Sequence, residues 1–229
     1  MKILAIDSTA NTSTVAVLEG KTLLSLFTVN TKNTHSETLL PMVKSLLASL
    51  RLSVDDIDAF AVSEGPGSFT GVRIGVATVK GLAFDKRKAC VGVSTIEALA
   101  QNLEGFDGII CPIMNARRGQ VYTGAFLDGE RIVEDQCMML ADLIPVLEKY
   151  KRPIYFTGDG YSLIEGMKNE SFRQTPEMLR YQNAYSVGVV AYKKLMAEDY
   201  TTDSELRVEY LRKPQAERER EERLENKGE

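Results

Sequence analysis

The first residues that could do chemistry in this sequence form a cluster of a carboxylate and two hydroxyls. Asp7, Ser8 and Thr9 directly follow residues 3–6, a short apolar run of strand-forming type. A carboxylate at a strand end with hydroxyls after it can hold Mg²⁺ and phosphate, but the same residue types are ordinary turn formers. The tip lacks a glycine that would let phosphate approach a backbone N–H. The sequence therefore favours a plain turn here over a nucleotide site.

A glycine-rich turn follows the apolar run of residues 57–62 and could bind an anion. Gly65 and Gly67 permit backbone angles that a Cβ forbids, and a helical pattern begins soon after them. A dinucleotide fingerprint is not matched, because Thr70 occupies the third glycine position, and a P-loop lysine is missing after the glycines. Phosphate binding is therefore the weaker hypothesis for this turn as well.

Two further turns in the second half of the sequence belong to the same hypothesis. Asn115 opens a polar turn between two strand-like runs, and Gly158 stands beside Asp159 at the end of another strand-like run. Ligands of α/β proteins bind at the carboxyl ends of such strands. Together these turns form a candidate vestigial nucleotide-binding site, which comprises Asp7, Ser8, Thr9, Gly65, Gly67, Asn115 and Gly158.

Small residues recur on one face of the helix expected over residues 70–84. Gly71, Gly75 and Thr78 are spaced by four and three, which strips that face of bulk and lets another helix approach closely. The spacing favours a partner protein's helix, and a helix of the same chain is the alternative.

Composition excludes several other classes of site. His35 is the single histidine, so a two-histidine metal site and a His-Glu-x-x-His protease are excluded within this sequence. Three widely spaced cysteines do not suggest a disulfide framework, and a reducing cytoplasm is expected. The net charge of −4 argues against stand-alone binding of nucleic acid, and no apolar run approaches a membrane span. Arg117 and Arg118 form a local basic cluster, for which a solvated loop is favoured over an RNA contact.

The order of expected elements predicts an α/β fold of two related halves. Each half opens with a hairpin, over residues 3–18 and 108–127, and continues through strands and helices. We place the first half at residues 1–100 and the second at 101–212. Residues 213–229 alternate basic residues with glutamate, so this charged tail is expected to be a solvated helix or disordered.

Several motifs in this order resemble the TsaB (YeaZ) family. They cover most of the chain to about residue 125, and the block of residues 65–75 is the most specific. The resemblance implies the actin, sugar-kinase and Hsp70-like (ASKHA) fold and a place in the bacterial machinery that makes threonylcarbamoyladenosine in tRNA. The motifs are Ile3-Leu4-Ala5-Ile6-Asp7-Ser8, Thr34-His35-Ser36-Glu37, Gly65-Pro66-Gly67-Ser68-Phe69-Thr70-Gly71-Val72-Arg73-Ile74-Gly75, Gly92-Val93-Ser94-Thr95 and Ala116-Arg117-Arg118-Gly119-Gln120-Val121-Tyr122.

The resemblance also implies that this chain is not the catalyst. The related TsaD carries a His-x-x-x-His metal pair after the equivalent of Gly92, and those two positions fall on Thr95 and Leu99 here. A hydroxyl and an aliphatic chain cannot replace two imidazoles. Asn115 departs from the family's usual aspartate and further weakens a nucleotide role. A peptidase activity is disfavoured by the single histidine, and a stand-alone ATPase or small-molecule kinase is the alternative function.

The expected function is therefore that of an accessory subunit. It binds TsaD and is required for transfer of threonylcarbamoyl to N6 of the adenosine next to the anticodon in tRNAs that read codons beginning with A. TsaE is expected to dock through the complex, a homodimer to form without TsaD, and tRNA to be contacted only within the complex. No cofactor is expected on this chain, and ATP and metal are expected on its partners. The helices over 36–50 and 70–84 supply the expected interface, which comprises Leu39, Leu40, Val43, Leu46, Leu47, Thr70, Gly71, Ile74, Gly75 and Thr78.

Overall fold

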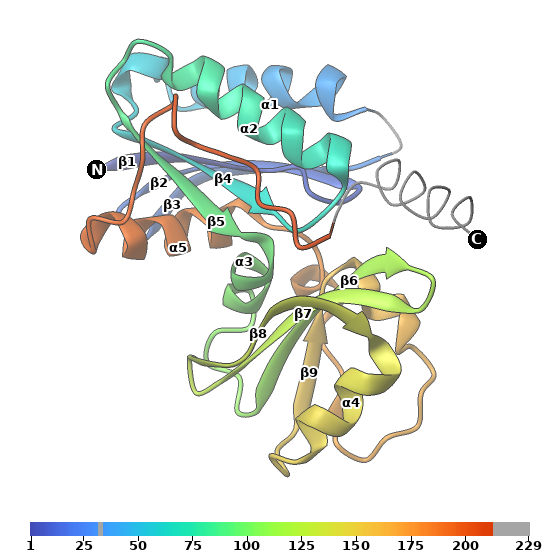
Figure 1. Cartoon of the computed structure of the whole chain (residues 1–229). Coiled ribbons are helices and arrows are strands. Elements are labelled where there is room, and N and C mark those ends of the chain that lie inside the picture. The colour runs from blue at the N-terminus through green and yellow to red at the C-terminus, as the bar shows by residue number, and fades with distance from the viewer. Residues whose placement is uncertain (32–33, 213–229) are drawn as a thin grey trace, which may run out of the picture.

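The structure is a computed structural model that describes residues 1–31 and 34–212. This part of the chain forms two lobes, each built on a five-stranded sheet (Figure 1). In the first sheet, β1 pairs antiparallel with β2 and parallel with β4. The strand order is β3 (Thr22–Asn30), β2 (Thr12–Glu19), β1 (Lys2–Asp7), β4 (Ala59–Gly65) and β5 (Ala89–Ser94).

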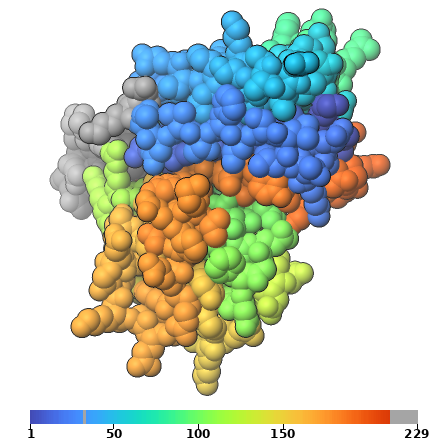
Figure 2. All heavy atoms as spheres, turned by 180° about the vertical axis from the view of Figure 1, so that it is seen from behind, coloured from blue at the N-terminus to red at the C-terminus, as the bar shows by residue number. Residues whose placement is uncertain are grey.

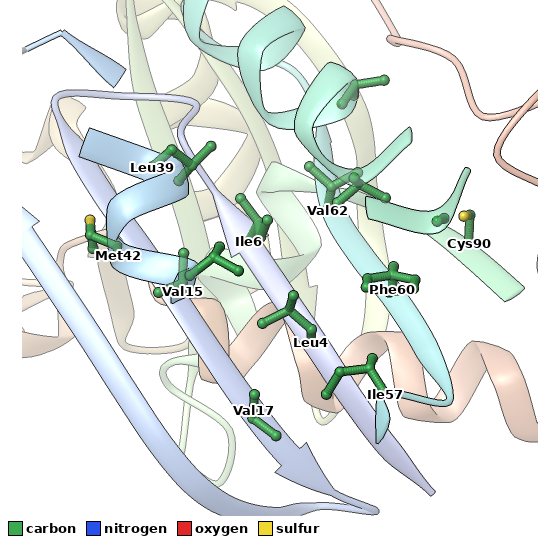
Figure 3. Packing of buried hydrophobic residues seen from close by; sticks show 14 of the residues in the cluster. Leu4, Ile6, Val15, Val17, Leu39, Met42, Ile57, Phe60, Val62 and Cys90 are labelled. Carbon is green, nitrogen blue, oxygen red and sulfur yellow. The ribbon is translucent and has the colours of Figure 1, made fainter. Parts of the chain in front are cut away.

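Helices cover both faces of the first sheet because alternate strand residues are apolar on both sides. Leu4 and Ile6 face α1 (His35–Ser49) and α2 (Phe69–Ala83), whereas Ile3 and Ala5 face α5 (Ala184–Met196). Figure 3 shows Leu39 and Met42 of α1 meeting the first of these faces near Val15 and Ile6, with Phe60 and Val62 of β4 farther along it. The sheet positions β1 and β4 so that their carboxyl ends meet at the boundary between the lobes.

The second lobe repeats the hairpin opening of the first. β6 pairs antiparallel with β7, which confirms the predicted hairpin, and it pairs parallel with β9. Helix α4 covers one face, and α3 lies between the lobes (Figure 1). The strand order is β10 (Phe172–Arg173), β9 (Ile154–Thr157), β6 (Ile109–Arg117), β7 (Gln120–Leu127) and β8 (Glu130–Met139), with α3 (Thr95–Gln101), α4 (Leu140–Glu148) and the short helices η1 (Val54–Asp56), η2 (Asp159–Leu163) and η3 (Glu177–Leu179).

The chain returns to the first lobe after it completes the second sheet. Helix α5 packs on the first sheet, and Leu206 is buried in the core beneath α2. Seen from behind, the orange segment that carries α5 lies under the blue residues of the first sheet (Figure 2). This return differs from the expected division, in which residues 101–212 form one half. The charged tail of residues 213–229 lies outside the described residues.

Helix α1 begins earlier than Pro41 suggested. Proline is disfavoured inside a helix, so Pro41 predicts a kink or a start near Leu40, yet the helix runs from His35 with Pro41 inside it. The spacing of Thr34 and Glu37 predicts a capping box, but the side chain of Thr34, the N-cap residue, makes no cap hydrogen bond, so the box does not form. Within residues 1–31 and 34–212, no helix combines the length and the apolar character that crossing a bilayer requires.

Candidate functional site

An apolar groove lies on the outer surface between α1 and α2. Its two hollows, of about 510 and 340 Å³, share Leu40 and Leu82. Leu40 is 53% exposed and projects from α1, and Ala77 is an exposed residue of α2. We call this surface the helix groove; it is lined by His35, Ser36, Leu39, Leu40, Val43, Lys44, Leu47, Ala48, Leu52, Ser53, Val54, Ile74, Ala77, Thr78, Gly81 and Leu82.

The expected interface residues divide into an outward and an inward set. Outward are Leu40 and Thr70, which are exposed, and Ile74 and Thr78, which are half-buried. Four leucine and valine residues belong to the core; three of them also line the helix groove, whereas Leu46 does not. These four are Leu39, Val43, Leu46 and Leu47. Sequence reasoning missed Ala77, Leu82 and Leu52. The spacing of Ala77 from Ile74 by three and of Leu82 from Thr78 by four was readable, whereas Leu52 lies beyond the end of α1.

Gly71 and Gly75 face the chain's own strand ends, which corrects the expectation that they admit another helix. A Cβ on Gly75 would lie 2.7 Å from Ser8 Oγ and 3.2 Å from Val62 Cγ2. A Cβ on Gly71 would overlap the Ser8 carbonyl oxygen. Ser8 Oγ donates a hydrogen bond to the Gly71 carbonyl at 2.9 Å. The small residues therefore seat α2 on β1, and neither glycine is available to a partner.

The expected nucleotide-binding residues of the first lobe gather around Asp7, beside a cleft between the lobes that we call the interlobe cleft. It is lined by Thr9, Ala10, Asn11, His35, Gly67, Ser68, Phe69, Thr70, Met114, Asn115, Ala116, Arg117, Tyr122, Asp159, Tyr210 and Arg212. The Asp7 carboxyl is buried and accepts hydrogen bonds from the Thr9 N–H and Oγ1, both at 2.8 Å, and from Ser63 Oγ at 2.6 Å. Burial raises the pKa of Asp7, and these three hydrogen bonds oppose the rise. Both carboxyl oxygens thus already have donors from the chain itself. Gly67 lines the cleft, with Thr9 where its Cβ would stand.

Asn115 and Asp159 lie on the opposite wall of the same cleft. The Asn115 N–H donates a weak hydrogen bond to Asp159 Oδ1 at 3.4 Å. Burial raises the pKa of Asp159, and the negative charge of Asp7 raises it further. Gly158 adopts φ +101°, and the Ile113 carbonyl occupies the place of its Cβ. Gly65 is similarly close to the Glu209 carbonyl, so Gly65 and Gly158 both serve packing of the chain itself.

His35, Thr95 and Leu99, which were considered from the sequence as possible metal ligands or their replacements, are all engaged in contacts within the chain itself. His35 joins α1 to the β1–β2 turn, with Nδ1 2.6 Å from Ser13 Oγ and Nε2 2.7 Å from the Ala10 carbonyl. Thr95 is fully buried and Leu99 packs in the core around α3. Across the described ranges, no group of three or more His, Cys, Asp or Glu side chains is arranged to hold a metal.

Glu64 is a perturbed carboxyl that sequence reasoning missed. It lies at the end of β4 against Gly92, under the segment that carries Glu209. Burial raises the pKa of Glu64 to about 7, and the charges of Glu209 and Asp199 add to the rise, whereas Lys194 opposes it. Lys194 comes from α5, and Asp199 and Glu209 come from the segment after it, so no local pattern around Glu64 indicated these neighbours.

Comparison with protein families identifies one that matches most of the chain. The family described as TsaD, tRNA N6-adenosine threonylcarbamoyltransferase, matches residues 27–220. The tRNA threonylcarbamoyladenosine biosynthesis protein TsaB of Bacillus subtilis (strain 168) is 42% identical over 73% of this chain and 75% of the relative. The protein of that name from Buchnera aphidicola subsp. Schizaphis graminum (strain Sg) is 30% identical over 81% of this chain and 90% of the relative.

Solved structures show the same fold. YeaZ from Pseudomonas aeruginosa superposes with a TM-score of 0.70 at 25% identity, covering 91% of this chain and 99% of the other. Component A of (R)-2-hydroxyglutaryl-CoA dehydratase from Acidaminococcus fermentans has a TM-score of 0.53 at 12% identity, covering 86% of this chain and 99% of the other. The second likeness concerns the fold alone, and together they agree with the two-lobed ASKHA architecture.

Proposed function

This chain belongs to the TsaB (YeaZ) family, and we propose that it is the non-catalytic subunit that binds TsaD in tRNA threonylcarbamoyladenosine biosynthesis. Its role in that biosynthesis is the one its relatives are named for. In the proposed complex it supports transfer of threonylcarbamoyl to N6 of the adenosine next to the anticodon in tRNAs that read codons beginning with A. Because the substrate is tRNA, we place this activity in the cytoplasm.

The observation that carries the proposal is the helix groove. Leu40 is 53% exposed there, beside Ala77, Ile74 and Leu82, so removing this surface from water is favourable. A partner of the same family brings an equivalent pair of helices. The two pairs can then form a four-helix contact across a pseudo-twofold axis, and a specific contact of this type buries roughly 1,600 Å² in total.

The non-catalytic role is supported by what surrounds the residues that would otherwise react. Thr95 and Leu99 are buried, and neither offers an imidazole for a metal. Asp7 is held by Thr9 and Ser63, which compete with any Mg²⁺ or phosphate for its oxygens. We therefore assign no cofactor to this chain and assign ATP and metal to its partners.

The same surface accounts for the remaining proposed partners. A second copy of this chain would use the helix groove when TsaD is absent, because the groove is then uncovered. TsaE would dock on the assembled pair, and tRNA would be bound only within the complex.

The test is co-elution with TsaD after a charge is placed in the helix groove. Leu40→Asp should abolish co-elution because a carboxylate would be buried without a partner. Leu23→Asp is the matched control, since Leu23 is 42% exposed but lies on β3, away from the groove. Thermal unfolding of both variants verifies that each is folded. Co-elution of a folded Leu40→Asp variant at the wild-type level would refute the assigned surface.

A further inference from the structure

Arg117 and Arg212 line the interlobe cleft, and two further arginines, Arg73 and Arg118, adjoin residues that line it. Arg73 Nε donates a hydrogen bond to Tyr210 Oη at 2.7 Å, and Arg212 Nη1 donates to the Ala116 carbonyl at 3.0 Å. Ala116 directly precedes Arg117 and Arg118 at the tip of the β6–β7 hairpin. The two lobes and the segment after α5 thus bring together basic residues that are far apart in the sequence.

This cluster is positive in a chain of net charge −4. Among the residues that the structure describes, Arg73, Arg117, Arg118 and Arg212 form no ion pair with a carboxylate. Arg117 and Arg118 are both exposed. The only carboxylate lining the described part of the cleft is Asp159, whose pKa is raised by burial. The N-terminus of α2 opens into the same cleft and adds partial positive charge.

Aromatic rings lie directly beside these arginines. Phe69 and Tyr210 are stacked with ring centroids 5.1 Å apart, and the Arg73 guanidinium carbon is 3.7 Å from the centroid of Phe69. Tyr122 lines the opposite wall of the cleft, which encloses about 470 Å³. Arginines without carboxylate partners, interleaved with aromatic rings, suit phosphates and unstacked bases, which bind by charge and by stacking. A purely acidic peptide would not use the rings.

We propose that this arginine-aromatic mouth is an RNA-binding surface that holds the tRNA while TsaD modifies it. The inference rests on the proposed function for the identity of the RNA, and on the cluster of arginines and rings for the contact itself. Arg117 and Arg118 contact phosphates, because they are exposed at the hairpin tip. Tyr210, which is 41% exposed and is backed by the Phe69 ring, provides the stacking surface for a base of the single-stranded loop.

The test is a titration of unmodified tRNA transcript with the TsaD complex and with the chain alone, at several salt concentrations. The variant is Arg117→Glu with Arg118→Glu. The matched control is Arg87→Glu with Lys151→Glu, because all four residues are exposed and have backbone φ between 51° and 65°. Co-elution with TsaD is measured separately, so that a failure of docking is distinguished from a failure of RNA binding.

The variant should bind tRNA about tenfold more weakly near physiological salt, with a salt slope shallower by about 1.4–1.8 from two lost phosphate contacts. Its co-elution with TsaD should be unchanged, and the control should bind tRNA within about twofold of wild type. If no complex forms, the proposed function fails, and the weak electrostatic binding of tRNA by the chain alone, which is measurable only at low salt, tests the arginine-aromatic mouth by the same change in slope. An unchanged affinity and slope would overturn the proposal. Loss of TsaD co-elution without loss of tRNA affinity would instead identify the mouth as a protein contact.

Discussion

At the scale of single residues, two carboxyl groups near the end of β4 differ in how they are compensated. Asp7 accepts three hydrogen bonds from Thr9 and Ser63, which oppose the effect of its burial on the pKa. The Glu64 carboxyl has Glu209 and Asp199 nearby, and only the charge of Lys194 favours its ionised form. Glu64 is therefore the group that should make stability depend on pH near neutrality.

Replacing Glu64 by glutamine should remove that dependence. In the folded chain the pKa of Glu64 is about 7, against an ordinary value of 4.5. Between these values the folded state retains a proton that the unfolded state has lost, so stability falls as pH rises from 4.5 to 7. Glu64→Gln should be more stable than wild type at pH 8 by about 1–2 kcal/mol, a figure reduced for solvent screening. At pH 4.5 the difference should be absent.

Urea unfolding at pH 4.5 and pH 8 measures this change. Glu130→Gln, at the exposed start of β8, is the control: it keeps Glu64, so its stability should fall with pH as that of wild type does, and its difference from wild type should be the same at both pH values. A stability gap between Glu64→Gln and wild type that stays constant with pH would show that Glu64 does not titrate in this window.

At the scale of elements, α2 has two kinds of glycine with opposite roles. Gly75 faces the sheet, where its Cβ would lie 2.7 Å from Ser8 Oγ, an atom already hydrogen-bonded to Gly71. Gly81 is exposed on the same helix, and nothing lies within 4 Å of its Cβ position. Helix propensity alone favours alanine at both positions, so the difference between the two isolates the packing against β1.

Alanine at the two positions should therefore change stability in opposite directions. Gly75→Ala should destabilise the chain by about 1–3 kcal/mol through overpacking, because Ser8 cannot move without losing its hydrogen bond. Gly81→Ala should stabilise it by up to about 1 kcal/mol. Urea midpoints at one pH provide the comparison. Equal changes of the same sign would mean that α2 is not seated on Ser8 in the way the structure describes.

The elements were largely predictable from local patterns, but their orientation was not. Apolar runs predicted β1, β2 and β4. Spacing showed that Gly71 and Gly75 share a face, yet spacing carries no information on what that face meets. The strand end at Ser8 is 63 residues from Gly71, so only the folded chain reveals the contact.

The candidate site was predictable to a similar extent. The exposed residue Leu40 and half-buried Ile74 were identified because their helices read clearly. The arginine-aromatic mouth could not be predicted from the sequence, because Arg73, Arg117 and Arg212 converge only through the return of the chain after α5. That return consists of a segment without helical or strand periodicity, held by the backbone pair Cys90–Thr201 and by the burial of Leu206.

At the scale of the whole molecule, the first lobe is made from two separate parts of the chain. Its sheet comes from the first 94 residues, but α5 covers one of its faces and Leu206 enters the core on the other. The two parts meet where the chain leaves and re-enters the lobe, since Asn102 Nδ2 donates to the Tyr181 carbonyl at 2.9 Å. The lobe should therefore fold only when both parts are present.

A fragment of residues 1–103 should fail to unfold cooperatively. Without α5, the face formed by Ile3, Leu18 and Val91 is exposed to water, and each such side chain forfeits about 1.5–3 kcal/mol of burial. A second fragment joins residue 103 to residue 181 by a short glycine-serine linker and ends at residue 212. A short linker suffices because the hydrogen bond between Asn102 and Tyr181 places the joined ends close together. This linked fragment should recover a cooperative urea transition. Both fragments lack the second lobe and expose the same side of α3, so the difference between them reports α5 and the segment after it. If the 1–103 fragment unfolds cooperatively at the same urea midpoint as the linked fragment, the first 103 residues fold as an independent unit and α5 contributes no stability to it.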